Sequence, residues 1–118
     1  MIKQASQQQV RTRENVRGGE GTLTFHDFLL PDESCGAGKL FSRTVVPAGA
    51  SIGEHRHEGE FEAYYVLAGA VEVLDGGAWR ALSQGDVHIC PNGQSHALRN
   101  GSAEDAQILM LILNDHTA

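Results

Sequence analysis

The 118-residue sequence has only two cysteines, Cys35 and Cys90, and no cluster of basic residues. Two thiols in a cytoplasmic protein are more often free than bridged, so no disulfide framework is predicted. Nucleic acids and anionic membranes require a basic surface, and the formal net charge of −6 argues against both as partners. These scarcities favour small molecules as the partners of this chain.

Long hydrophobic runs are also missing. The apolar run from Ile108 to Leu113 is six residues long, far below the roughly 20 that span a bilayer. The first 15 residues are polar and lack the apolar core of a secretory signal. A cytoplasmic protein is therefore expected.

The length suits a single domain over residues 1–118. No stretch has a 3.6-residue apolar period, and turn signals recur between runs of β-forming residues, which predicts an all-β sandwich or barrel. Residues 1–17 are expected to be a mobile arm or an isolated edge segment, and 17–21 a flexible glycine-rich entry to the first strand. The Asp75-Gly76 pair suits a tight hairpin turn. Strands are predicted at 22–30, 39–46, 62–68, 71–74, 79–82, 86–90, 95–99 and 107–113.

The strands at 62–68 and 107–113 are apolar on both faces. A strand with one face in water would not have this pattern, so another part of the structure is expected to cover the outer face. That cover is either a second subunit or the N-terminal arm. Because dimerisation would also protect exposed sheet edges, a homodimer is expected.

The clearest chemical signal lies between Gly49 and Gly69. On an extended strand, His55 and His57 point to the same face. A hairpin at the acidic turn that follows would bring the carboxylate of Glu62 back beside the two imidazoles. Three ligands could thus converge on one metal ion within a short piece of chain.

The spacing of these residues resembles the two sequence signatures of the cupin superfamily. The first is carried by Gly49, His55, His57, Glu62 and Gly69, and the second by Gly85, Pro91, Gly93, His96 and Asn100. The 15 residues between the signatures resemble the short spacing of compact bacterial cupins of the oxalate decarboxylase-like group. The resemblance implies a double-stranded β-helix, or jelly-roll barrel.

The resemblance also implies one divalent transition metal per chain, held inside the barrel by His55, His57, Glu62 and His96. Three imidazoles and one carboxylate suit Mn, Fe, Ni, Co, Cu or Zn, and the ligands alone do not choose among them. About two positions of an octahedral ion would stay open to bind and polarise the oxygen atoms of a substrate. Within the second signature, Asn100 would serve structure.

Three further side chains are candidate catalytic residues: Tyr64, His88 and Glu60. Tyr64 shares the face of Glu62, so its hydroxyl could enter the cavity as a hydrogen-bond donor or acid, or its ring could belong to the core. His88 is a candidate general base if its apolar strand neighbours face outward, and a surface residue otherwise. Glu60, in the acidic turn, is a candidate proton donor or a solvated residue. Arg43 could clamp a carboxylate if it points inward, although a solvated position is favoured.

The favoured function is a metal-dependent lyase or oxidoreductase that acts on a small oxygen-rich substrate such as a carboxylate. Compact cupins with this ligand set resemble oxalate decarboxylase-like proteins, and similar sites serve oxygenases and sugar isomerases. Thiol dioxygenases fit less well, because that branch usually lacks the residue present here as Glu62. The alternatives are a sugar isomerase-type cupin and a non-catalytic module that binds a sugar or a carboxylate. Fold alone does not decide among them.

Overall fold

The structure is a computed structural model that describes residues 1–117. It is built from ten strands and three short 3-10 helices, with no α-helix in the described part of the chain, which confirms the all-β prediction. No helix among residues 1–117 is long and apolar enough to cross a membrane. In chain order the elements are η1 Ala5–Gln7, β1 Gln9–Glu14, η2 Val16–Gly18, β2 Thr22–Asp27, η3 Pro31–Ser34, β3 Gly38–Val46, β4 Ser51–Arg56, β5 Glu60–Ala68, β6 Ala70–Asp75, β7 Ala78–Ser83, β8 Val87–Cys90, β9 Ser95–Arg99 and β10 Ala106–Asn114.

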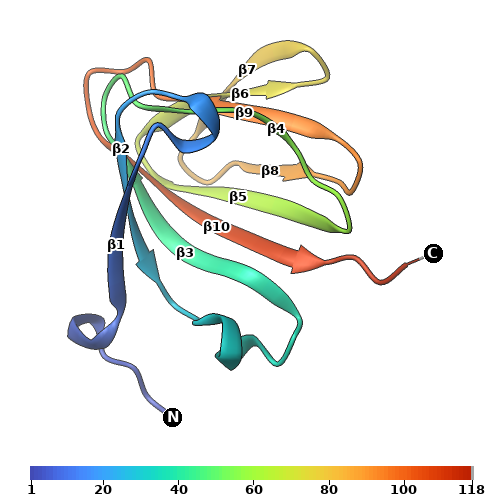
Figure 1. The fold of residues 1–118 in the computed structure, drawn as a ribbon. Coiled ribbons are helices and arrows are strands. Elements are labelled where there is room, and N and C mark those ends of the chain that lie inside the picture. The colour runs from blue at the N-terminus through green and yellow to red at the C-terminus, as the bar shows by residue number, and fades with distance from the viewer. Residues whose placement is uncertain (118) are drawn as a thin grey trace.

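Two antiparallel sheets enclose the core as a jelly-roll barrel (Figure 1). The larger sheet has the strand order β1-β2-β3-β10-β5-β8, and the smaller has the order β4-β9-β6-β7. The last strand, β10, lies inside the larger sheet between β3 and β5, so both of its edges are paired. This topology confirms the jelly roll that the signatures imply.

The inward face of β5 divides the interior into a polar and an apolar part. Glu62, Tyr64 and Val66 alternate along this face, and all three are buried. Val66 lies opposite Ile108 of β10, and both belong to the apolar core between the sheets. Each such side chain contributes roughly 1.5–3 kcal/mol through burial. The core therefore fixes the strand that presents Glu62 to the other part of the interior.

The N-terminal segment forms the edge of the larger sheet. Residues 9–14 pair in continuous register with residues 22–27 of β2. The guanidinium group of Arg11 donates to both carboxylate oxygens of Asp27, at 2.6 and 3.2 Å, and lies 4.4 Å from the ring centroid of Phe25. Residues 9–14 are thus a paired edge strand of the larger sheet, not an isolated segment.

Two strand boundaries differ from the prediction for local reasons. The strand predicted at 22–30 ends at Asp27, because the chain bends at Phe28, whose ring meets Phe41 edge-on at 5.0 Å. The hairpin between β6 and β7 turns at Gly76 and Gly77, with φ of 60° and 83°. Asp75 is still paired with Ala78, so the turn is centred one residue later than the Asp-Gly pair suggested.

Candidate metal centre

A bulge in β4 directs His55 into the barrel. The pairing of β4 with β9 shifts between Ile52 and His55, so the two residues both face inward although three positions separate them. A β-bulge adds one residue to a strand and reverses the alternation beyond it. His55 then lies directly opposite His96 of β9. The bulge thus brings two imidazoles from neighbouring strands together.

His57 lies just after β4 and is held by the turn of the second signature. Its backbone N–H donates to the carbonyl of Gln94 at 3.0 Å, and its carbonyl accepts from the N–H of Gly93 at 2.7 Å. The side chain of Asn92 accepts from the N–H of Gly59 at 2.8 Å. The two signatures are therefore joined by hydrogen bonds, which fix where the His57 imidazole points.

The ligand atoms of His55, His57, Glu62 and His96 all lie within 4.8 Å of one another. Nε2 of His96 is 3.0 Å from Nε2 of both His55 and His57, and 3.0 Å from Oε1 of Glu62. Oε1 of Glu62 is 3.1 Å from Nε2 of His57 and 3.9 Å from Nε2 of His55. Atoms bound to one ion at roughly 2.1 Å are roughly 3 Å apart at adjacent octahedral positions, so these spacings fit a shared cation.

The outer ring nitrogens of His55 and His57 explain why a cation fits here. Nδ1 of His55 lies 2.8 Å from the carbonyl oxygen of Gly53, which can only accept, so this nitrogen carries the proton. Nδ1 of His57 lies 2.7 Å from a carboxylate oxygen of Glu60, which also accepts. In the neutral imidazoles the converging Nε2 atoms are therefore lone-pair donors that face one another and a carboxylate. Such partners are typical of metal-binding histidines.

The charged groups of the site shift each other's pKa values. Burial would raise the pKa of the Glu62 carboxyl, but hydrogen bonds with His55, His57 and His96 outweigh it and hold the pKa well below its usual range. The Glu62 hydrogen bond raises the pKa of His57 against the opposing effect of burial, and Glu60 adds to the increase. A proton therefore competes with a metal for His57.

Glu60 supports the cluster from outside it. One carboxylate oxygen contacts Nδ1 of His57, and the other lies 2.6 Å from Nζ of Lys39. Its neighbour in the acidic turn, Glu58, is exposed and lies 3.5 Å from Nε of Arg56. The structure thus places Glu60 behind His57, as the partner that orients this imidazole, and leaves Glu58 at the surface.

His88 faces inward and lies behind His96. Its apolar neighbours Val87 and Ile89 are 56 % and 58 % exposed, whereas the His88 side chain is buried. Nε2 of His88 is 3.2 Å from Nδ1 of His96. Burial, followed by the proximity of His96, lowers the pKa of His88, so it is neutral and can accept a hydrogen bond. Of the two orientations considered for His88 from the sequence, the structure shows the one in which the side chain faces the interior.

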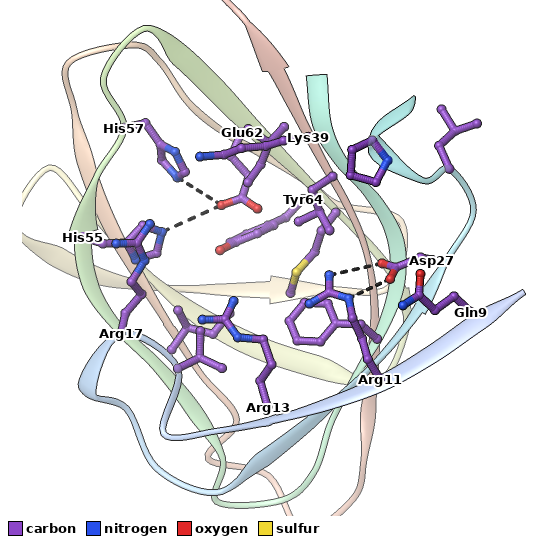
Figure 2. Close-up of a pocket in the computed structure, with 18 of the residues that line it drawn as sticks. Gln9, Arg11, Arg13, Arg17, Asp27, Lys39, His55, His57, Glu62 and Tyr64 are labelled. Atoms are coloured by element: carbon purple, nitrogen blue, oxygen red, sulfur yellow. Dashed lines mark hydrogen bonds and ion pairs between the residues drawn. The ribbon is translucent and has the colours of Figure 1, made fainter. Parts of the chain in front are cut away.

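Tyr64 carries a buried hydroxyl without a hydrogen-bond partner among the described residues. The residue is 1 % exposed, and its ring stacks on His96 at 5.0 Å between centroids. Figure 2 shows the hydroxyl pointing into the space beside Glu62. Burial and then the charge of Glu62 raise the pKa of Tyr64 well above its usual value, so the group is a hydrogen-bond donor. A buried donor without a protein partner can be satisfied by a water, an ion or a ligand atom.

Arg43 does not line the cavity beside the cluster. Its Nη1 donates to Oε1 of Gln107 at 3.1 Å, on the outer face of the larger sheet. Asn100, in contrast, is buried and holds the loop after β9, because its amide nitrogen donates to the carbonyls of Val46 and Glu104 at 2.9 and 2.8 Å. The hydrogen bonds of Asn100 therefore stabilise the loop after β9. Arg43, on the outer face of the sheet, does not reach the cluster.

A cavity of about 440 Å³ opens from the cluster to the surface between β1, η2 and the loop before η3. Four cationic side chains that the motif reasoning missed line it: Arg11, Arg13, Arg17 and Lys39. The alternation of Arg11 and Arg13 would place both on one face of a strand, which was the available sequence signal. Figure 2 shows Arg13 and Arg17 directed into the same space as His55.

Comparison with known proteins is consistent with this geometry. The profile of the cupin domain family matches residues 42–112. A Thermotoga maritima protein named as oxalate-binding is 34 % identical over 113 residues, covering 96 % of this chain and 93 % of the relative. The crystal structure of a predicted oxalate decarboxylase from Thermotoga maritima is 33 % identical, covers 98 % of this chain and 100 % of its own, and superposes with a TM-score of 0.91. A polyketide cyclase from Streptomyces resistomycificus, 22 % identical, shares the fold with a TM-score of 0.74 over 97 % of this chain and 80 % of its own.

Proposed function

The chain belongs to the cupin family, and we propose on this premise that it binds small carboxylates at a metal centre held by His55, His57, Glu62 and His96. The observation that carries the proposal is the convergence of three imidazole lone pairs and one carboxylate at the floor of an open cavity. A divalent ion bound there would attract and polarise carboxylate oxygens. The relative named as oxalate-binding makes oxalate the first ligand to test.

The surrounding residues have distinct parts in this proposal. Tyr64 donates its unpaired hydroxyl proton to an oxygen of the bound carboxylate. Glu60 and His88 accept from the outer ring nitrogens of His57 and His96, so that in the neutral rings the inner nitrogens carry the lone pairs. Glu62 is buried, so little water surrounds the oxygens of a carboxylate bound beside it. Polar contacts to those oxygens are therefore stronger than they would be in water.

Catalysis as a lyase or oxidoreductase is the second candidate, and Tyr64 favours it. A decarboxylase needs a proton donor beside the substrate, and the Tyr64 hydroxyl is buried, protonated and unpaired at that place. Glu60 and His88, the other two candidates, are each engaged with a histidine of the cluster, which favours a binding protein without turnover. The neighbour named as a predicted oxalate decarboxylase supports testing for turnover.

The experiment begins with elemental analysis of protein purified without added metal. We expect about one transition-metal ion per chain, and oxalate binding by calorimetry only when the metal is present. His57→Ala should lose the metal, whereas the matched variant His26→Ala, on β2, should retain it. Loss of the metal in both variants would count against the site. Oxalate binding that does not depend on the metal content would also count against it. Release of carbon dioxide from oxalate by the loaded protein would favour the enzyme over the binding protein.

A homodimer through the outer face of β5 and β8 is part of the same proposal. Four side chains on these strands are large, apolar and exposed: Tyr65, Leu67, Val87 and Ile89. β8 is also an edge strand with one unpaired side. A second copy that covers this face would remove the apolar surface and the free edge from water together.

A further inference from the structure

Acidic partners neutralise two of the four cationic side chains that line the cavity. Arg11 is bonded to Asp27, with a shortest contact of 2.6 Å, and Lys39 lies 2.6 Å from Glu60. Arg13 and Arg17 make no ion pair with any residue in the range 1–117. In a chain with a formal net charge of −6, the cavity mouth therefore holds two uncompensated guanidinium groups.

The backbone is arranged so that Arg17 reaches the cavity. Arg17 has φ of 55°, a left-handed conformation that non-glycine residues rarely adopt. A Cβ atom at Gly53 would overlap the carbonyl oxygen of Arg17, and one at Gly19 would overlap that of Ser51. Only glycine at these positions lets η2 lie directly on β4, the strand that carries His55. The left-handed backbone at Arg17 and this close approach together place the arginine beside the cavity.

The cavity has a buried polar floor, an exposed mouth and apolar walls. His55, His57, Glu62 and Tyr64 line the floor, whereas Arg13 and Arg17 are exposed and line the mouth. The apolar side chains that line the same cavity include Ile52, Leu40 and Ile112. A volume of about 440 Å³ lies within the range of roughly 300–1,000 Å³ typical of sites for ligands much larger than oxalate. In oxalate the two carboxylates are joined directly, so an oxalate bound through both of them at the floor would leave the walls and the mouth unused.

We propose that Arg13 and Arg17 form a second anion subsite, and that the preferred ligand is an elongated dianion. One carboxylate binds at the metal cluster and beside Tyr64, an aliphatic body lies against the apolar walls, and a second acidic group, carboxylate or phosphate, lies between the two guanidinium groups. Arginine suits this place because its planar fork matches both kinds of acid. This inference rests on the proposed function, since it assumes the carboxylate site at the floor.

Calorimetric titration of the metal-loaded protein tests the inference directly. The ligands are oxalate, succinate, glutarate and adipate, with pentanoate as the monoanion that matches glutarate in length and a phosphonate analogue of glutarate as the second acid type. We expect one of the longer dianions to bind more tightly than oxalate, and about tenfold or more tighter than pentanoate. If glutarate binds more tightly than its phosphonate analogue, the second acidic group is a carboxylate. If the analogue binds more tightly, the second acidic group is a phosphate.

Arg13→Gln and Arg17→Gln then locate the subsite. Each should weaken binding of the best dianion about tenfold and change oxalate binding less than threefold. Arg80→Gln, an exposed arginine on β7 outside the cavity, controls for the loss of one positive charge. Thermal melts of each variant verify that it is folded.

The outcomes separate this inference from the proposed function. Oxalate binding that equals or exceeds that of every longer dianion would overturn the elongated ligand and leave the carboxylate site intact. The subsite would also be overturned if the arginine variants lost as much affinity for oxalate as for the long dianion. The same would follow if Arg80→Gln weakened binding of the long dianion as much as Arg13→Gln or Arg17→Gln. Failure of the metal-loaded protein to bind any of the carboxylates would overturn the proposed function, and this inference with it.

Discussion

Nδ1 of His96 lies 3.2 Å from Nε2 of His88, and both imidazoles are buried. Burial lowers the pKa of His88, so its ring is neutral and its Nε2 can accept a proton from Nδ1 of His96. With that proton on Nδ1, Nε2 of His96 faces the other ligand atoms as a lone pair. In this arrangement His88 selects the tautomer in which His96 can bind a metal.

The first prediction concerns this contact. His88→Leu should weaken metal affinity by about 10- to 100-fold, because it removes the acceptor that orients His96. His88→Gln places an amide oxygen near the position of Nε2 and should recover most of the affinity. Competition with a calibrated chelator measures both variants. Equal losses in the two would indicate a packing effect and not a hydrogen bond.

The second prediction separates stability from binding at Tyr64. Tyr64→Phe removes a buried hydroxyl that has no hydrogen-bond partner within residues 1–117, so the free energy of unfolding should stay unchanged or rise by roughly 1 kcal/mol. Carboxylate affinity should fall several-fold in the same variant, because the ligand loses a donor. Denaturant unfolding and calorimetry give the two values. A clear loss of stability would mean that the hydroxyl is already satisfied in the folded protein.

The third prediction is the pH dependence of metal binding. Since hydrogen bonds from the His57 ring to the carboxylates of Glu62 and Glu60 raise the pKa of His57, this imidazole keeps a second proton to higher pH in the metal-free protein. A metal needs the neutral ring, so apparent affinity should fall as pH decreases through the raised pKa, and binding should release a proton. Calorimetry in buffers of different ionisation enthalpy counts that proton. A pH-independent affinity between pH 5 and about 8 would contradict the assignment.

The fourth prediction uses the two thiols. Cys35 is exposed, whereas burial raises the pKa of the Cys90 thiol to about 11. An aromatic disulfide reagent at mildly alkaline pH should therefore modify one thiol per native chain and two per unfolded chain. Cys35→Ser should abolish the rapid reaction. Rapid modification of both thiols in native protein would place Cys90 nearer the surface than the structure does.

The fifth prediction tests the proposed dimer. Replacing Ile89 by Lys puts a charge on the apolar outer face of β5 and β8 and should shift the protein to monomer in analytical ultracentrifugation. Leu74→Lys, on a strand of the smaller sheet, serves as the matched control, because Leu74 is only partly buried and lies outside that face. A wild-type protein that sediments as a monomer at all concentrations would remove the dimer from the proposal.

The convergence of His55, His57 and Glu62 could be predicted because their spacing is local. The parity of His55 and His57 and the return of Glu62 depend on one hairpin, and the second signature adds His96. Even so, the route differs in detail, since His57 lies after the end of β4 and a bulge is what turns His55 inward. Alternation describes an ideal strand, and the bulge is a departure that alternation alone does not reveal.

Other features of the site depend on packing between residues that are far apart in the sequence, and no short sequence pattern reveals such packing. The parity of His88 was visible, but only the pairing of β8 with β5, which puts His88 opposite the buried Tyr64, decides which face meets the interior. Arg17 reaches the cavity because η2 lies on β4, a contact between segments about 35 residues apart that depends on Gly53. The cytoplasmic location and the homodimer stay predictions.

The family profile begins at residue 42, whereas Arg13 and Arg17 lie before it. The part of the chain that defines the family therefore carries the metal cluster, and a separate preceding segment furnishes the mouth of the cavity. Such a division is modular. If Arg13 and Arg17 bind an acidic group as proposed, substitutions in the preceding segment would change ligand preference and leave the four residues of the cluster untouched.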